Sequence, residues 1–294
     1  MNIAIHGKGL NPADKEFILS FFDHLNNLSI NFWVEEHYLK SFELTDYKFP
    51  ISTYSTAKDL LHFKVQYIIS MGGDGTLLDT LNYSKETNLA VLGINLGRLG
   101  FLSGTPREKA FDAIESLING QFSIEKRSLL ELHSNSDLFG DLNYALNDFT
   151  IHKRDTGSMI TIDTYLNGEF FTSYWADGLI VSTPTGSTAY SLSCGGPVIL
   201  PDSNTFVITP VAPHNLNIRP IIIPDTSVVS FRIKGRGNSH LVSLDSRYEI
   251  VDYAKEIGIQ KADFYFNILR FNEQHFINTL REKLSWGLDT RNFY

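Results

Sequence analysis

The sequence of 294 residues has one cysteine, Cys194, few basic residues and no long apolar run. A single cysteine cannot form a disulfide within the chain, and this is typical of proteins of the reducing cytoplasm. No apolar run approaches the roughly 18 residues that a membrane-spanning helix needs, which excludes an integral membrane protein. The first residues, from Met1 to Ile5, are strand-like and lack a charged region, so we expect no secretory signal.

Positive charge is also scarce. Lys and Arg number 25 against 33 Asp and Glu, which gives a formal net charge of −8. Proteins held to nucleic acid or to anionic lipid by bulk electrostatics carry the opposite sign. We therefore expect no nucleic-acid partner and no membrane partner, although a local site for a phosphate-bearing small molecule is compatible with this charge.

The length predicts two domains, at about 150 residues each. In the first part strand-like and helix-like patterns alternate, which favours a parallel sheet covered by helices on both faces. The expected strands are residues 2–6, 65–69 and 89–94, and the expected helices are residues 14–28, 77–83 and 107–118.

The pattern changes near Arg127. Short β-rich runs separated by turn residues such as Asn167-Gly168 follow, and they favour antiparallel sheet. The runs are residues 129–133, 145–152, 159–166, 178–182, 205–210, 227–233 and 239–244. Helical spacing returns over residues 272–284. We expect an α/β nucleotide-binding domain over residues 1–127, with residues 269–294 packing back on it, and a β-rich, sandwich-like domain over residues 128–268.

The segment Gly72-Gly73-Asp74-Gly75-Thr76 lies between a buried strand and the start of a helix. Backbone N–H groups in such a loop bind anions, and glycines allow a phosphate to approach closely. No Gly-Lys-Ser/Thr follows, so this is not a Walker A loop. A carboxylate in a phosphate loop either holds a bridging metal ion or accepts a proton from an attacking hydroxyl, and both roles indicate phosphoryl transfer. A Gly-Asp-Gly turn without function is the alternative.

A second polar segment runs from Ser182 to Ser191 and follows the expected strand 178–182. Six Ser and Thr hydroxyls around one Gly and one Pro suit the hydroxyls, amides and ring nitrogens of a nucleotide, and Tyr190 could stack on a base. The alternative is a polar surface loop with a helix N-cap at Ser187 or Thr188.

Two further positions are candidates for nucleotide contacts. Arg98, in a glycine-rich stretch after a strand, could hold a phosphate bidentately, although a lone arginine is more often a solvated surface charge. Asn147 and Asp148 offer an amide and a carboxylate suited to the adjacent hydroxyls of a ribose, with an Asx turn as the alternative.

The sequence offers no dedicated metal site and no marked nucleophile. The nine histidines do not cluster, and neither a His-Glu-x-x-His motif nor a Cys/His ligand spacing is present. A Gly-x-Ser-x-Gly elbow is also missing, and no motif marks Cys194. Any metal is expected to be Mg²⁺ carried in with nucleotide phosphates.

Together these segments resemble the NAD kinase family, which phosphorylates NAD to NADP. Residues 72–76 match the family's phosphate loop, which diacylglycerol and sphingosine kinases share. Asn147-Asp148 falls at the family's Asn-acid pair, and Thr183-Pro184-Thr185-Gly186-Ser187-Thr188-Ala189-Tyr190 reproduces its most specific signature. A further match is Pro213-His214-x-Leu216-x-x-Arg219-Pro220, so the resemblance covers residues 65–245.

The resemblance implies an α/β domain and a β-rich domain with the active site between them, in a cytoplasmic homo-oligomer (a dimer or tetramer) that uses NAD and ATP. Asp74 would be the base that takes the proton from the 2′-hydroxyl of the adenosine ribose of NAD. The phosphate loop would comprise Gly72, Gly73, Gly75, Thr76 and Arg98. The implied NAD contacts are Asp74, Gly75, Asn147, Asp148, Asp177, Thr188, Ala189, Tyr190, Ser191, Leu192, Ser193 and Ala212.

Three positions depart from the family pattern. Asp148 stands where glutamate is commoner, Trp175 where some relatives have a basic residue, and Asp245-Ser246-Arg247 where Asp-Gly-Gln or Asp-Ser-Gln is usual. The roles of Trp175 and Arg247 stay open at this point. Two other functions also stay open. One is a lipid kinase that shares the Gly-Gly-Asp-Gly-Thr loop, and the other is a non-catalytic NAD(P) sensor that keeps the pocket without turnover.

Overall fold

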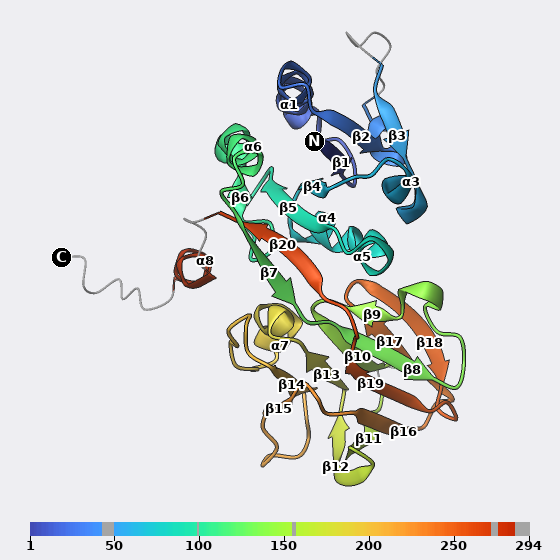
Figure 1. Ribbon diagram of the computed structural model, residues 1–294. Helices are drawn as coiled ribbons and strands as arrows, with labels where there is room; N and C mark the ends of the chain where they lie inside the picture. The colour runs from blue at the N-terminus through green and yellow to red at the C-terminus, as the bar shows by residue number, and fades with distance from the viewer. Residues whose placement is uncertain (43–49, 99, 155–156, 272–275, 286–294) are drawn as a thin grey trace, which may run out of the picture. The chain divides into compact units, whose positions relative to one another are not determined.

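A computed structural model describes residues 1–42, 50–98, 100–154, 157–271 and 276–285. The chain forms two compact units, one of Met1–Lys126 with Phe266–Tyr294 and one of Arg127–Tyr265 (Figure 1). In the described part of the chain, no helix is both long and apolar enough to cross a membrane. Each unit is described in turn.

The first unit contains eight strands and seven α-helices among its described residues. Its strands are β1 (Asn2–His6), β2 (Asn31–Glu35), β3 (Ser52–Tyr54), β4 (Tyr67–Met71), β5 (Ala90–Asn95), β6 (Thr105–Pro106), β7 (Ser123–Arg127, which leads into the second unit) and β20 (Phe266–Arg270). Its helices are α1 (Lys15–Asn27), α2 (Glu36–Lys40), α3 (Ala57–His62), α4 (Asp74–Asp79), α5 (Leu81–Thr87), α6 (Ala110–Ile118) and, near the end of the chain, α8 (Phe276–Leu284), with short 3₁₀ turns η1 (Pro12–Asp14) and η2 (Arg107–Lys109).

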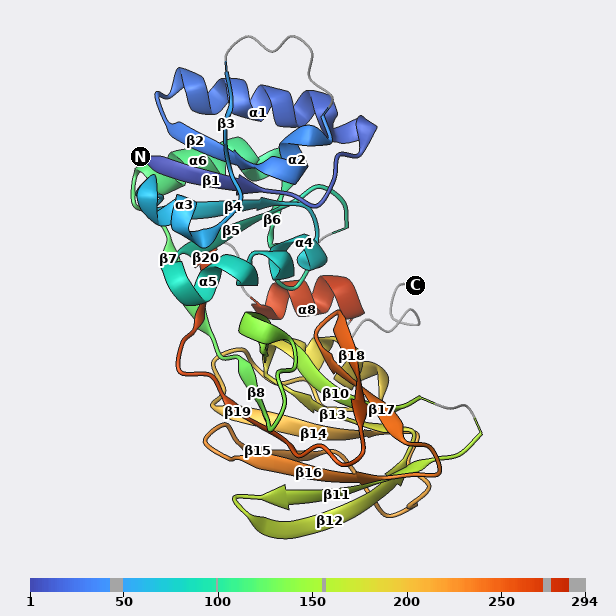
Figure 2. The same cartoon turned by 90° about the vertical axis from the view of Figure 1, so that its right-hand side faces the viewer.

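The strands of this unit form one sheet in the order β3-β2-β1-β4-β5-β20-β7, with β6 beside β5. The pairs from β3 through β20 are parallel. Helices α1 and α6 lie over one face and α3 and α5 over the other (Figure 2). Because helices cover both faces, a central strand such as β5 is buried along its whole length and appears in the sequence as a continuous apolar run.

Helix α1 shows how the sequence builds this layer. Pro12 opens the preceding turn, and the Asn11 side chain accepts a hydrogen bond from the backbone N–H of Ala13 (3.1 Å). The apolar side chains of α1 then recur at helical spacing and are buried against the sheet; they are Phe17, Ile18, Phe21, Phe22 and Leu25.

The second unit is built almost entirely of strands. These are β8 (Leu130–Ser134), β9 (Tyr144–Ala145), β10 (Asp148–Lys153), β11 (Ile160–Leu166), β12 (Glu169–Ala176), β13 (Gly178–Ser182), β14 (Thr205–Val211), β15 (Ile221–Pro224), β16 (Val229–Lys234), β17 (Ser239–Leu244), β18 (Arg247–Asp252) and β19 (Ile257–Lys261). Two short 3₁₀ turns, η3 (Gly140–Leu142) and η4 (Thr185–Thr188), and one short helix, α7 (Tyr190–Ser193), complete it.

These strands form two antiparallel sheets, in the orders β15-β14-β13-β10-β17-β18 and β12-β11-β16-β19-β8-β9. Both sheets contribute to one hydrophobic cluster. Within it the Phe149 ring of the first sheet stacks on the Phe231 ring of the second, with 5.4 Å between ring centroids. The unit is therefore a β-sandwich.

The fold class expected from the sequence, an α/β unit with a parallel sheet and a β-rich antiparallel unit, is confirmed. The expected helix at 77–83 differs in the structure. Helix α4 already begins at Asp74, and the chain forms a second helix, α5, from Leu81. Residues 74–76 of the expected phosphate loop therefore lie in a first helical turn. Of the expected helix at 272–284, residues 272–275 lie outside the described residues, and the rest is α8.

Candidate functional site

The glycine loop of the first unit connects β4 to α4. The backbone N–H of Gly72 donates to the carbonyl of Ile94 on β5 (2.9 Å), which fixes the loop at the end of the sheet. Gly72 has a φ of 153°, and a Cβ there would lie 2.3 Å from Thr76 Oγ1, so only glycine fits. No atom lies within 4 Å of a Cβ built at Gly73 or Gly75. These two glycines therefore leave backbone open to an incoming group.

Asp74 is half-buried, and its carboxylate accepts three backbone hydrogen bonds. Phe101 N–H donates to Oδ2 (2.8 Å), while Leu102 and Ser103 N–H donate to Oδ1 (3.1 and 2.9 Å). An ionised carboxylate has about four acceptor positions, so three donors leave it able to accept one more hydrogen bond. The side chain is thus held in one orientation without being saturated.

Gly100 makes room for this arrangement. A Cβ built on Gly100 would lie 1.7 Å from Asp74 Oδ1, which is closer than any real contact. The hydroxyl of Ser103 donates to the carbonyl of Gly72 (3.0 Å), and this second bond ties the 101–103 segment to the glycine loop. The glycine-rich stretch after β5 therefore serves to hold Asp74.

Asn95 shapes the turn that precedes this segment. Its side-chain amide donates to the carbonyl of Arg98 (2.7 Å), and its side-chain oxygen accepts from Gly97 N–H (2.8 Å). The side chain of Arg98 is exposed at the tip of this turn. The structure thus places Arg98 in the same loop as the residues that hold Asp74, with its side chain accessible to a ligand.

In the second unit, the Asn147–Asp148 pair lies against the segment that follows β13. The carbonyl of Asn147 accepts from Thr183 N–H (2.9 Å) and from the Ser182 hydroxyl (3.2 Å). A Cβ on Gly186 would lie 2.0 Å from this same carbonyl oxygen. Glycine at 186 is therefore required for the signature segment to pack against the Asn-acid pair.

Asp245 holds the Asn-acid pair from the other side. Its carboxylate accepts from the backbone N–H groups of Leu146 (2.9 Å), Asn147 (2.7 Å) and Asp148 (3.2 Å). Burial raises the pKa of the Asp245 carboxyl, although these three donors and Arg247 oppose that rise. Asp245, the first residue of the Asp-Ser-Arg stretch that differs from the family pattern, thus binds the backbone of the candidate site.

The Asp148 carboxyl is buried at the start of β10, with 6% of its surface exposed. Burial, and secondly the charge of Asp245, raise its pKa to about 7. Near neutral pH this side chain therefore exists both as an acid that donates a hydrogen bond and as a carboxylate that only accepts. Such a group can donate a hydrogen bond to the oxygen of a ribose hydroxyl or accept one from its proton.

The Ser/Thr-rich segment differs from the expectation that its hydroxyls gather around a ligand. Ser182, Thr183, Ser187 and Ser191 are fully buried. Their hydroxyls bond within the protein, as when Thr183 donates to the carbonyl of Leu146 (2.5 Å) and Ser191 shares a bond with the Thr209 hydroxyl (2.9 Å). Nor does Ser187 or Thr188 cap the helix, because α7 begins after Ala189. The hydroxyls of Ser182, Thr183 and Ser187 satisfy buried backbone carbonyls and fix the shape of the turn, while that of Ser191 pairs with another side chain.

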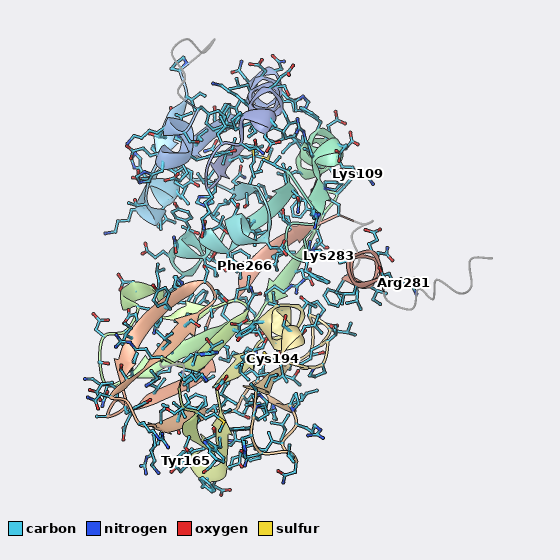
Figure 3. The ribbon with its side chains drawn as sticks, turned by 180° about the vertical axis from the view of Figure 1, so that it is seen from behind. Lys109, Tyr165, Cys194, Phe266, Arg281 and Lys283 are labelled. Atoms are coloured by element: carbon cyan, nitrogen blue, oxygen red, sulfur yellow. The ribbon has the colours of Figure 1, made fainter. Side chains whose placement is uncertain are left out.

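The residues around α7 are more accessible. Thr188, Ala189 and Leu192 are half-buried, and Ser193 and Tyr190 are exposed, Tyr190 at 40%. Burial raises the pKa of the Tyr190 hydroxyl and that of the Cys194 thiol (labelled in Figure 3), and each group also influences the pKa of the other. The charges of Asp148 and Asp177 also raise the pKa of Tyr190. The structure thus brings α7 near both carboxylates.

Asp177 and Ala212 lie together at the other end of β13. The Asp177 backbone N–H donates to the carbonyl of Val211 (3.0 Å), and its carboxylate pairs with the Lys153 ammonium (2.6 Å). Ala212 is exposed with a φ of 45°, a left-handed conformation that is uncommon for alanine. The backbone here turns sharply beside a carboxylate, as it often does at ligand sites.

The structure gives defined contacts to Trp175 and Arg247, the two side chains that differ from the family pattern and whose roles were open. The Trp175 ring lies against the His214 ring, with 4.3 Å between centroids, and is 45% exposed. The Arg247 guanidinium donates to the backbone carbonyls of Leu142 and Tyr144. Arg247 thus supports the chain just before the Asn-acid pair, and this contact gives it a structural role.

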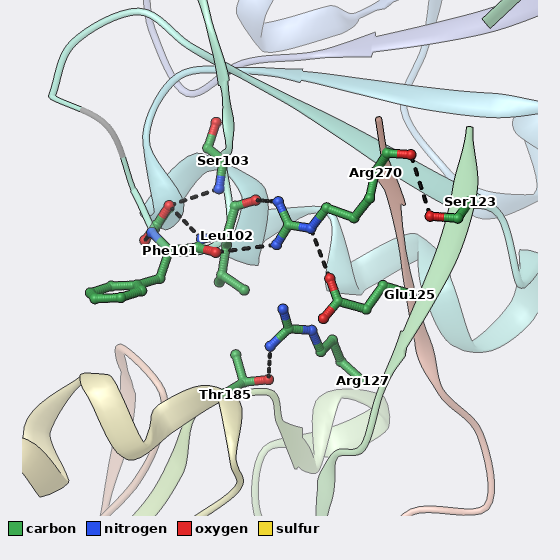
Figure 4. Close-up of polar contacts among 9 residues, drawn as sticks. Phe101, Leu102, Ser103, Ser123, Glu125, Arg127, Thr185 and Arg270 are labelled. Atoms are coloured by element: carbon green, nitrogen blue, oxygen red, sulfur yellow. Dashed lines mark hydrogen bonds and ion pairs between the residues drawn. The ribbon is translucent and has the colours of Figure 1, made fainter. Parts of the chain in front are cut away.

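Sequence reasoning missed Arg270, at the end of β20. Its guanidinium donates to the carbonyls of Phe101 and Leu102 and pairs with Glu125 on β7 (Figure 4). No motif marks it, because its partners are backbone carbonyls about 170 positions earlier in the chain. In the part of the chain that the structure describes, no group of three or more His, Cys, Asp or Glu side chains could hold a metal ion.

Comparison with known families gives the same assignment for both units. The family described as the ATP-NAD kinase N-terminal domain matches residues 20–122, and the ATP-NAD kinase C-terminal domain matches residues 146–271. The NAD kinase of Cytophaga hutchinsonii is 44% identical over 294 residues, covering 99% of this chain and 100% of the relative. The NAD kinase of Flavobacterium psychrophilum is 43% identical over 297 residues, with the same coverage.

Two solved structures share this fold. Yeast NADH kinase complexed with NADH has a TM-score of 0.88 and 26% identity, covering 100% of this chain and 90% of that one. An NAD kinase from Archaeoglobus fulgidus in complex with ATP has a TM-score of 0.76 over 98% of this chain and 100% of that one; at 23% identity this likeness shows the fold alone. The chain therefore belongs to the NAD kinase family, the phosphotransferases that convert NAD to NADP.

Proposed function

We propose that Asp74 is the general base of an ATP-dependent phosphorylation of NAD at the 2′-hydroxyl of its adenosine ribose. The observation that carries this proposal is the geometry of the Asp74 carboxylate, which three backbone N–H groups fix while one acceptor position remains. A carboxylate so arranged can accept the proton of a hydroxyl as that hydroxyl attacks.

In the proposed step the 2′-oxygen of NAD forms a bond to the γ-phosphorus of ATP, and the bond between that phosphorus and the β,γ-bridging oxygen breaks. The leaving ADP keeps the electron pair, and the 2′-hydroxyl proton passes to Asp74. Such reactions depend chiefly on positioning and charge neutralisation. Gly73, Gly75 and Thr76 and the exposed Arg98 would contact the phosphates.

We place NAD on residues of the second unit that the fold leaves accessible or polar. Asp148 and Asn147 would bind ribose hydroxyls, and the exposed Tyr190 ring would stack on a base. Ser191 would act only through its backbone, because its hydroxyl already bonds to Thr209. The remaining proposed NAD contacts are Gly75 of the first unit and, in the second unit, Asp177, Thr188, Ala189, Leu192, Ser193 and Ala212.

Mg²⁺ would enter with the triphosphate. Magnesium keeps several waters and commonly binds through substrate phosphates plus one or two carboxylates, so it does not need a site made only of protein groups. The residues present are compatible with that mode, because the backbone at Gly73 and Gly75 is open to the triphosphate that would carry the ion. Bound in this way, the ion would neutralise charge that develops on the transferring phosphoryl group.

We further propose a cytoplasmic homo-oligomer, a dimer or a tetramer. The single cysteine suits a reducing compartment, and the resemblance to the family implies the oligomer. Sedimentation velocity across a range of protein concentrations tests the oligomer directly. Neither a lipid kinase nor a non-catalytic sensor gains an observation of its own, since both matching family models describe NAD kinases.

The test is an assay of the purified protein with NAD, ATP and MgCl₂ that measures NADP, with Asp74→Asn beside the wild type. General-base catalysis contributes about 10²–10⁴-fold, so we expect turnover to fall by at least about 100-fold. Asp79→Asn is the matched control, because Asp79 lies in the same helix and pairs with Lys8 instead (3.3 Å). Wild-type protein that binds NAD but forms no NADP would contradict the proposal, and so would equal losses in both variants.

A further inference from the structure

Two consecutive peptide groups connect Asp74 to an arginine from the far end of the chain. The peptide group between Phe101 and Leu102 and the one between Leu102 and Ser103 each donate their N–H to Asp74 Oδ1. On the opposite side, the carbonyls of these same peptide groups accept from Arg270, at 3.2 Å for Phe101 and 3.1 Å for Leu102. Each peptide group therefore lies between an anion and a cation.

Arg270 is itself held in place. Its Nε donates to Glu125 Oε2 (2.8 Å) on β7, the strand next to β20 in the sheet. The side chain of Arg270 is 13% exposed and that of Glu125 is 31% exposed. Figure 4 shows the guanidinium reaching Phe101 and Leu102 on one side and Glu125 on the other. The arginine is thus fixed at both ends of its planar fork.

We propose that Arg270, oriented by Glu125, is a positioning residue that sets the direction of the Asp74 carboxylate through the peptides at 101–103. This proposal rests on Asp74 acting as the base, as proposed above. A cation on the carbonyl side polarises each peptide group and strengthens the N–H bond that the group donates to Asp74. The planar fork matches two adjacent carbonyls, whereas the single ammonium of lysine is a point charge that cannot hold both in the same way.

Loss of Arg270 should affect turnover more than the binding of NAD. The acceptor position that Asp74 keeps open must point at the ribose hydroxyl, and a misplacement of about 1 Å costs on the order of 100-fold in rate. NAD affinity depends on many other contacts. We therefore expect Arg270→Gln to lower kcat by about 10- to 100-fold while the KM and Kd for NAD change by less than about 3-fold. Arg270→Lys should fall between that variant and the wild type.

The matched control is Arg107→Gln. Arg107 also belongs to the first unit and forms an ion pair, with Asp14 (2.9 Å), while its guanidinium lies over the Phe17 ring. Losing that pair removes a comparable interaction without touching the 101–103 segment. We expect its kcat to match the wild type, and an equal loss of kcat in both variants would overturn the proposal.

A double-mutant cycle separates positioning from general stability. If Arg270 acts through Asp74, adding Arg270→Gln to Asp74→Asn should lower residual turnover by less than about 2-fold, because the base is already absent. Independent effects that multiply in the double variant would overturn the proposal. Glu125→Gln should reproduce part of the Arg270→Gln effect, and it gives a second variant if the first fails to fold.

Chemical rescue adds an independent measurement. A cavity of about 1000 Å³ in the first unit is lined in part by Phe101, Glu125 and Arg270. Guanidinium at millimolar concentration should therefore reach the space left by Arg270→Ala and restore part of kcat, while it leaves Arg107→Ala unchanged. Failure of guanidinium to raise the kcat of Arg270→Ala above that of a sodium chloride control would count against the positioning role.

A wild-type protein that makes no NADP contradicts the proposed function itself. The role of Arg270 is measured separately by amide hydrogen exchange, which should accelerate at Phe101, Leu102 and Ser103 in Arg270→Gln and stay unchanged in Arg107→Gln. Unchanged exchange at these three amides in Arg270→Gln would overturn the inference even in an active enzyme.

Discussion

Asp74 serves two purposes in one side chain. Its carboxylate organises the backbone at 101–103 through three hydrogen bonds, and its remaining acceptor position is the one proposed to take a proton. Asparagine would replace one carboxylate oxygen by an NH₂ group, which cannot accept from the backbone N–H groups. Asp74→Asn therefore removes hydrogen bonds as well as the base. Its melting temperature should therefore be measured together with its turnover.

Gly100→Ala gives a test of Asp74 that leaves the carboxylate in place. The added methyl would need the space of Asp74 Oδ1, 1.7 Å away, so the side chain must turn out of its three hydrogen bonds. We expect kcat to fall by at least about 10-fold in a steady-state assay.

Gly97→Ala is the control for this substitution in the same loop. The nearest atom to its added methyl is Asn95 Oδ1 at 4.0 Å, an ordinary contact. Its kcat should stay close to that of the wild type. Equal activity of the two alanine variants would show that the position of Asp74 does not limit turnover.

The raised pKa of Asp148 makes a prediction about stability. In the folded protein this carboxyl has a pKa of about 7 because it is buried beside Asp245, whereas in the unfolded chain it ionises near pH 4. Between about pH 4 and pH 7 the Asp148 carboxyl therefore binds a proton more tightly in the folded state than in the unfolded state. The wild type consequently loses stability as the pH rises through this range. Asp148→Asn should remove this loss, a gain on the order of 2–4 kcal/mol above pH 7 that shrinks towards pH 4.

Urea unfolding of Asp148→Asn and wild type at pH 5, 6.5 and 8 measures this difference. Asp202→Asn, at an exposed position of the same unit, controls for the loss of one charge. The stability gain of Asp148→Asn should grow with pH, while the difference for Asp202→Asn should stay nearly constant. A gain that is independent of pH would show that Asp148 ionises normally in the folded protein.

At the scale of elements, the 3₁₀ turn η4 and the start of β10 act as one piece. The carbonyl of Asn147 accepts from Thr183 N–H, and the absence of a side chain at Gly186 lets η4 approach that carbonyl. The buried hydroxyls of the segment satisfy the polar groups that this close approach removes from water. The shape of the candidate NAD site thus depends on the fit of a turn against a strand.

Gly186→Ala should separate these two elements. Its methyl would lie 2.0 Å from the Asn147 oxygen, and such overpacking costs about 1–3 kcal/mol. We expect a lower free energy of unfolding in urea and weaker NAD binding in calorimetry, since Asp148 follows Asn147 directly. Gly157→Ala, where no atom lies within 4 Å of the added methyl, should change neither quantity.

The elements that the sequence predicted are those with strong local patterns. The buried run of β5 and the periodic face of α1 were expected, and so was the turn at Asn167-Gly168, where both residues have positive φ. Strands β2, β3, β7, β12, β15, β18, β19 and β20 were not predicted, and β2 and β3 show why. Strand β2 mixes Asn and Glu with aromatic residues, and β3 has only three residues, so neither shows a period.

The candidate site was predictable only where chemistry lies in contiguous residues. Asp74 and the Asn147–Asp148 pair stand in short motifs, and the structure gives each a defined environment. Arg270 could not be found in this way, because it acts on backbone carbonyls that any sequence would supply. Nor could the sequence show that Ser182, Thr183, Ser187 and Ser191 face inward, since a hydroxyl that binds a ligand and one that satisfies a carbonyl look alike.

At the scale of the whole molecule, the two units differ in how the chain builds them. The second unit, Arg127–Tyr265, is one continuous stretch with a hydrophobic cluster of its own. The first unit needs two separate stretches, because β20 lies between β5 and β7 in its sheet and Leu269 belongs to its core. Only the second unit is therefore formed by one continuous stretch of the chain with its own complete core.

This difference predicts unequal behaviour of fragments. A protein of residues 127–265 should fold alone and unfold cooperatively in urea, with a circular dichroism spectrum of β-structure, because it keeps all strands of both sheets. Residues 1–126 alone should show no cooperative transition, since removing β20 leaves β5 and β7 without the strand between them and opens the core at Leu269. Joining residues 266–294 to residues 1–126 through a flexible linker should restore the transition. If residues 1–126 unfold cooperatively without that addition, β20 is not required for the first unit, and the stretch that carries Arg270 is an accessory to the sheet.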